Sequence, residues 1–168
     1  MGPKSSGAYP GPACYGFGGP LCLTDINLLL GRLDPSHFSV PLIKDDAEKK
    51  LLEIENITGR SSIELLHGFL AIADDAMANA IRKISIEEGY DPSEHALVAF
   101  GGAGGQHACG VASRLGMKTI LSPADAGLLS AYGLAQSRVE RILVRSVLGP
   151  MDCGVLNSLE MEMEREGM

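Results

Sequence analysis

The chain has 168 residues, of which 45% are hydrophobic, and its 14 basic and 21 acidic side chains give a net charge of −7. This length and hydrophobic content fit one folded domain, or a piece of a larger one, and exclude a disordered chain. The acidic balance, the lack of a Lys/Arg cluster and the absence of tryptophan argue against a nucleic-acid partner.

The N-terminal part of the chain is expected to be a loop followed by two helices. Residues 1–20, "MGPKSSGAYPGPACYGFGGP", are too rich in glycine and proline for a helix or a regular strand. Thr24 or Asp25 is then the expected N-cap of a short helix that stops within 31–35. A second helix is expected over 46–56, with an acidic first turn.

The longest expected helix begins at Ser61 or Ser62, in "SSIELLHGFLAIADDAMANAIRKISIEEG". Apolar residues recur in steps of three or four, which predicts one continuous stripe that lies against something flat. The residues of this stripe are Ile63, Leu66, Leu70, Ala73, Met77, Ile81 and Ile84.

A strand, a helix and a second strand are expected next. "HALVAF" is typical of a buried strand, a helix follows near 105–115, and "KTILSP" predicts a second short strand. This order predicts a parallel crossover unit. Further along, a helix is expected over 126–136, a strand or an extended tail over 141–149, and an exposed helix over 157–167.

The expected fold class is therefore α/β, with a short mixed or parallel sheet packed with helices. We expect three regions: a Gly/Pro-rich loop and short helix over 1–35, an α/β subdomain over 36–150, and a C-terminal helix or tail over 151–168. Ligands of such sheets gather at the carboxyl ends of the strands, which is where the glycine-rich segment 101–105 falls.

That segment, "GGAGG", stands between the first expected strand and its helix. The first N–H groups of a helix have no partner inside the helix and carry partial positive charge, and glycine lets another molecule approach the backbone. The sequence is thus compatible with a phosphate site here. A tight turn without a ligand is the alternative.

The remaining composition points to a cytoplasmic protein without a metal site. No apolar run is long enough to span a bilayer, and no signal-peptide pattern is present. The four cysteines, Cys14, Cys22, Cys109 and Cys153, are too far apart for a zinc knuckle, so we expect reduced thiols. A metal held by His107 and Cys109 is a minor alternative.

Several segments together resemble one protein family. "SGAYPGPACYGFGGPLCLTDINLLLGRL", "AMANAIRKISIEEGYDP", "LVAFGGAGGQHACGVASRLGMKTIL" and "GLLSAYGLA" occur in the order and spacing of the hydantoinase A and 5-oxoprolinase family. The form "GGAGGQHA" is similar to the 5-oxoprolinase branch. The resemblance implies an actin-like (ribonuclease H-like) ATPase core that uses ATP and Mg²⁺ to phosphorylate the amide oxygen of a cyclic amide, after which water opens the ring.

The resemblance also implies partners. A hydantoinase B-like protein is expected beside a small cyclic amide and ATP. Relatives of the same architecture are subunits of ketone carboxylases, so a non-catalytic nucleotide-binding or scaffold subunit of such a complex is the alternative.

The chain departs from the family in one respect. Both aspartate-bearing phosphate loops of the type D-x-G-G-T-x-T-D are absent from the sequence. The chain therefore resembles the last third of the core, the half of the cleft near the nucleoside. We expect the isolated chain to be inactive, and its incomplete sheet to favour self-association.

The resemblance singles out candidate site residues. The family's glycine loop corresponds to Gly101, Gly102, Ala103, Gly104 and Gly105, which are expected to contact nucleotide.

Two further residues are candidates for catalysis. Asp25 matches a family acid, although a helix N-cap predicts the same residue type. His107, in the first helical turn after the glycines, is placed to donate to a phosphate or substrate oxygen, or to hydrogen-bond locally. Of Asp74 and Asp75, one is expected to face solvent and the other to approach the cleft or cap a loop. Arg82 is placed to reach a phosphate or to pair with one of them.

Overall fold

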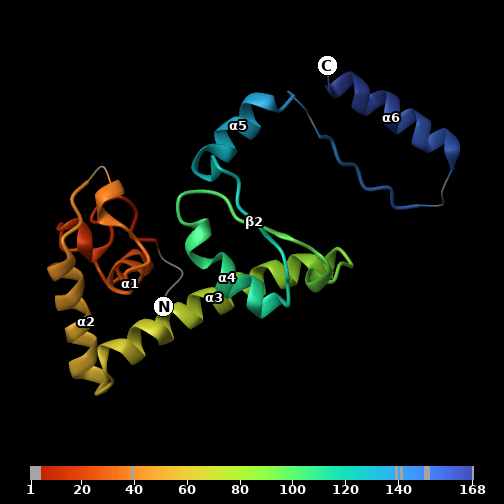
Figure 1. Ribbon diagram of the computed structural model, residues 1–168. Coiled ribbons are helices and arrows are strands. Elements are labelled where there is room, and N and C mark those ends of the chain that lie inside the picture. The colour runs from red at the N-terminus through yellow and green to blue at the C-terminus, as the bar shows by residue number, and fades with distance from the viewer. Residues whose placement is uncertain (1–4, 39, 139, 141, 150–151, 168) are drawn as a thin grey trace. The chain divides into compact units, whose positions relative to one another are not determined.

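The computed structural model describes residues 5–38, 40–138, 140, 142–149 and 152–167. The chain forms two compact units, Met1–Ser130 and Ala131–Met168, with the boundary inside one helix. The expected α/β class is confirmed, although helices dominate. The helices are α1 Leu23–Leu29, α2 Lys44–Thr58, α3 Ser62–Glu87, α4 Gly104–Leu115, α5 Leu129–Gln136 and α6 Cys153–Gly167, and the strands are β1 Leu97–Val98 and β2 Ile120–Leu121 (Figure 1).

Residues 5–20 of the Gly/Pro-rich segment form a loop, as expected, with one turn of 3₁₀-helix at Ala13–Tyr15. It folds back on itself so tightly that a Cβ at Gly19 would lie 1.9 Å from the carbonyl oxygen of Gly11. The predicted N-cap of α1 was wrong. The cap is Cys22, and Asp25 is the third residue of the helix. From there its carboxylate accepts a hydrogen bond from the Cys22 N–H, as in a capping box.

The helix α2 extends beyond the expected 46–56 at both ends, and α3 begins at Ser62, as expected. Local signals explain the ends of both helices. Gly59, in the left-handed conformation, ends α2. Ser61 and Glu64 form a capping box at the start of α3, with the Glu64 carboxylate accepting from the N–H and hydroxyl of Ser61. These hydrogen bonds hold the pKa of Glu64 below its usual value.

The single apolar stripe predicted for α3 was wrong in part. Ile63 and Ile84, at its two ends, are 56% and 63% exposed, whereas Leu65 and Ala78 are buried. The reason is that α3 packs on helices and not along one flat sheet: its first half contacts α1 and α2, and its second half contacts α4 (Figure 1).

The predicted parallel crossover is confirmed. β1 pairs with β2 in parallel, with Leu97 opposite Ile120 and Val98 opposite Leu121, and α4 lies between them in the chain. Leu97 packs on the core between α3 and α4. Val98 and Leu121 occupy the opposite face of the sheet and are half exposed.

The C-terminal part contains the two expected helices and no further strand in its described residues. Residues 126–136 form a 3₁₀ turn followed by α5. Residues 142–149 have no regular structure, so the tail alternative is correct for them, and residue 141 lies outside the described residues. The final helix, α6, begins earlier than expected. Among the residues that the structure describes, no helix combines the length and apolarity that a membrane crossing requires.

Candidate functional site

The glycine-rich segment leaves β1 and opens α4, as expected from the sequence. Gly101 has a φ of 82°, which favours glycine, and its N–H donates to the carbonyl of Ala126 at 2.8 Å. Cβ atoms placed at Gly101, Gly102 or Gly105 would meet no atom within 4 Å. The outer side of this loop is therefore open to an approaching molecule.

His107 lies one turn into α4, directly behind the glycine loop. Its side chain is buried, and Nδ1 lies 2.7 Å from Oδ1 of Asp74 on α3. Its Nε2 lies 3.1 Å from Nδ2 of Asn27 on α1. Both ring nitrogens therefore have protein partners, and neither is free for a ligand in this arrangement.

The protonation of this ring follows from its neighbours. Asn27 Nδ2 also donates to the carbonyl of Leu23 at 3.1 Å, and turning the amide around would place its oxygen against that carbonyl. Nδ2 is therefore the donor, and Nε2 of His107 accepts. The proton lies on Nδ1, which donates to Asp74. The other amide atom, Asn27 Oδ1, is buried without a hydrogen-bond partner.

Arg114 completes the cluster from the last turn of α4. Its Nη1 lies 3.5 Å from Oδ2 of Asp74, and its Nε donates to Asp75. Its remaining donors reach the carbonyls of Gly110 and Ala71. We call Asn27, His107, Asp74 and Arg114 the buried histidine cluster.

The expectation that one aspartate faces solvent is correct, since Asp75 is exposed and Asp74 is buried. The pairing expected for Arg82 was wrong: it donates to the Asn79 side chain and to the Arg114 carbonyl. Arg114, which the sequence did not single out, pairs with both aspartates.

Asp25 is completely buried and anchors the Gly/Pro-rich loop. Its carboxylate accepts hydrogen bonds from the backbone N–H groups of Ala13, Cys14 and Cys22, at 3.1, 2.8 and 2.6 Å. Burial, followed by the neighbouring Asp25, raises the pKa of the Cys14 thiol to about 12. The catalytic roles of Asp25 and His107 stay predictions.

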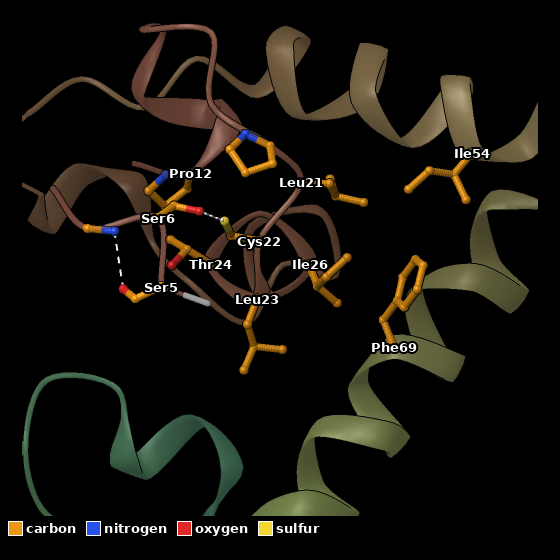
Figure 2. Close-up of a pocket in the computed structure, with 12 residues that line it drawn as sticks. Ser5, Ser6, Pro12, Leu21, Cys22, Leu23, Thr24, Ile26, Ile54 and Phe69 are labelled. Carbon is orange, nitrogen blue, oxygen red and sulfur yellow. Dashed lines mark hydrogen bonds between the residues drawn. The ribbon is translucent and has the colours of Figure 1, made fainter. Parts of the chain in front are cut away.

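A pocket of about 550 Å³ opens between the Gly/Pro-rich loop, α1, α2 and α3. Figure 2 shows an apolar wall that includes Ile26, Ile54 and Phe69. Across the pocket, the hydroxyl of Ser6 lies 3.2 Å from the sulfur of Cys22. All twelve lining residues are uncharged, so the pocket suits a small neutral molecule. Sequence reasoning missed it, because residues from four separate segments meet there.

Within the described parts of the chain, no group of three or more His, Cys, Asp or Glu side chains is arranged to hold a metal ion. Cys109 is exposed and His107 is buried, so these two side chains do not share a surface.

Comparison with known proteins decides the family. The model of the hydantoinase/oxoprolinase family matches residues 1–142. The chain belongs to the hydantoinase/oxoprolinase family. This family member is 44% identical over 157 residues to a 5-oxoprolinase of Pestalotiopsis fici, in an alignment that covers 83% of the chain. The chain spans only 12% of that relative's length.

Two solved structures resemble this member of the hydantoinase/oxoprolinase family. The crystal structure of an ATP-dependent caprolactamase from Pseudomonas jessenii is 34% identical, with a TM-score of 0.76, over 99% of this chain and 26% of that one. A nucleotide-free structure of acetone carboxylase, described as an enzyme of ATP-dependent acetone carboxylation, is 27% identical, with a TM-score of 0.73, over 83% of this chain and 20% of that one.

Proposed function

We propose that this chain forms the nucleotide side of the cleft in an ATP-dependent cyclic-amide hydrolase of the 5-oxoprolinase or N-methylhydantoinase type, with an actin-like core. The observation that carries the proposal is the open glycine loop at the start of α4, in a chain 44% identical to a 5-oxoprolinase. The proposed activity belongs to the whole protein. The segment that this chain matches makes up 12% of the 5-oxoprolinase and 26% of the caprolactamase chain.

The chain's own part in the proposed reaction is to bind phosphate. The backbone N–H groups of Gly104 and Gly105 open α4, where the helix dipole favours an anion. The absence of side chains at Gly101 and Gly102 lets phosphate oxygens come close to the backbone. When bound, ATP supplies the phosphoryl group that activates the amide oxygen, and water then opens the ring.

Two expected participants lie outside the chain's own residues. Mg²⁺ is expected to accompany ATP, and we assign no residue of this chain to it, because no three His, Cys, Asp or Glu side chains among the described residues are arranged to hold a metal ion. A hydantoinase B-like partner is also proposed. A relative 38% identical to this chain is named a caprolactamase subunit alpha, a name that implies further subunits in that protein.

A second function is favoured by the similarity to acetone carboxylase. In that case the chain is a non-catalytic nucleotide-binding or scaffold subunit of a ketone-carboxylase-like complex. The two functions differ in whether a cyclic amide stimulates ATP turnover. That stimulation, measured on the protein completed with both family phosphate loops and its partner, supports the hydrolase. Nucleotide binding without it supports the scaffold.

The glycine loop is tested by calorimetry with a non-hydrolysable ATP analogue, on the protein completed with both family phosphate loops. Replacing Gly102 or Gly104 with valine is expected to abolish binding, because a branched side chain occupies the path to the backbone. Gly68→Ala, at an open glycine in α3, is the matched control and leaves binding unchanged. Unchanged affinity in both valine variants would reduce the loop to a plain turn.

A further inference from the structure

Two polar contacts join the start of α4 to α1 and to the segment that follows α1. One is the hydrogen bond between His107 Nε2 and Asn27 Nδ2, at 3.1 Å. The other is donated by the guanidinium of Arg32, just beyond α1, to the carbonyl of Gln106. Both contacts hold the first turn of α4, which begins at the glycine loop, against α1 and the residue Arg32 that follows it.

We infer that His107 is a positioning residue: as a neutral imidazole held between Asp74 and Asn27, it orients the first turn of α4, and with it the glycine loop, against α1. The inference rests on the proposed nucleotide site for its consequence in binding. It gives His107 a role different from direct contact with a phosphate or substrate oxygen.

The chemistry of the buried histidine cluster requires an imidazole. Asp74 needs a donor and Asn27 Nδ2 needs an acceptor, and a neutral histidine presents one of each on two edges of a rigid ring. The Asp74 charge, which is buried, has Arg114 as its counter-ion at 3.5 Å. Each of these buried polar groups would be costly if it lost its partner, so the set resists displacement as a unit.

The cluster also reaches the uncharged pocket of Figure 2. Asn27 Nδ2 donates to the carbonyl of Leu23, and Leu23 lines that pocket. His107 therefore sets the place of the glycine loop relative to the segment of α1 that forms the pocket wall.

The first test is the tautomer of His107, measured by ¹⁵N NMR on the histidine-labelled chain at pH 8. We expect the proton on Nδ1, with Nε2 unprotonated. Asn27→Asp removes the amide donor that Nε2 accepts from, so the Nε2 signal of His107 should shift. A proton on Nε2 in the unmodified chain, or an unaltered His107 signal in Asn27→Asp, would overturn the inference.

The second test is the response of the glycine loop, read from the backbone amide signals of Gly104 and Gly105. His107→Asn keeps a donor for Asp74 and loses the acceptor for Asn27, and His107→Gln does the reverse. Both variants should shift these glycine signals, and His67→Asn, at an exposed histidine of α3, should not. Unshifted glycine signals in both His107 variants would contradict the positioning role. Two variants are used so that the test still stands if one of them does not fold.

The affinity of the ATP analogue separates this inference from the proposed function. Each His107 variant is expected to bind about tenfold more weakly, as for the loss of one hydrogen bond. If the protein completed with both family phosphate loops does not bind the analogue while the tautomer and glycine signals behave as expected, the nucleotide proposal fails and positioning stands. If the analogue binds the completed protein and both of its His107 variants equally, positioning fails and the nucleotide proposal stands.

Discussion

Gly110 leaves the space that the carboxylate of Asp74 occupies. A Cβ built on Gly110 would lie 2.0 Å from Oδ2 of Asp74, far inside any real contact. Because His107 and Arg114 both contact the Asp74 carboxylate, it cannot move away from an added Cβ without losing one of these contacts. The close packing of α3 on α4 thus depends on a glycine at this position.

Gly110→Ala is expected to destabilise the chain by about 2–4 kcal/mol, through overpacking and the loss of buried hydrogen bonds. The free energy of unfolding, measured in urea, checks this. Gly68→Ala is the matched control: no atom lies within 4 Å of its added Cβ, so it should stabilise α3 by about 0.5–1 kcal/mol. Equal effects of the two substitutions would contradict the packing described here.

Asp25→Asn should loosen the Gly/Pro-rich loop. Asparagine offers one oxygen where the carboxylate offers two, so at least one of the three N–H groups loses its acceptor, and the charge that strengthens these bonds is gone. We expect a loss of about 2 kcal/mol or more in the free energy of unfolding.

Hydrogen exchange at Ala13, Cys14 and Cys22 would show where the stability is lost. Asp45→Asn, an exposed acid in the first turn of α2, serves as the control and should leave these three amides protected. Protection that survives in Asp25→Asn would show that the loop is held by other contacts.

Cys14 should resist alkylation while the chain is folded. Its pKa is raised to about 12, so at pH 8 only about one thiol in ten thousand is ionised, and the side chain is buried. Cys109 and Cys153 are exposed and should react first. Peptide mapping after timed treatment with iodoacetamide, with and without urea, measures this order, and early labelling of Cys14 would refute it.

The uncovered face of the sheet is expected to promote self-association. Val98 and Leu121 are 47% and 52% exposed there, and parallel sheets are ordinarily covered on both faces. Light scattering should report a species larger than the monomer. Leu121→Lys should weaken the association at least tenfold, whereas Ile57→Lys, at an exposed position on α2, should not. If the unmodified chain is a monomer that unfolds cooperatively on heating, the exposed face of the sheet does not drive self-association.

Local patterns in the sequence determined most elements of this protein. The Ser61/Glu64 box marks the start of α3, Gly59 marks the end of α2, and apolar runs around a glycine loop indicate strand, helix, strand, because these signals act between residues close in the chain. The same short-range motifs identified the family and the glycine loop.

Only the tertiary structure decided which polar groups are buried together. Asp74 lies in a helix whose pattern predicted an apolar stripe, and its partners are 33 and 40 residues away, at His107 and Arg114. Asn27 reaches His107 across 80 residues, and the uncharged pocket draws its walls from four segments. Periodicity reports which face of one helix is apolar, but a buried charge is set by partners on other elements, and those partners meet only once the helices have packed.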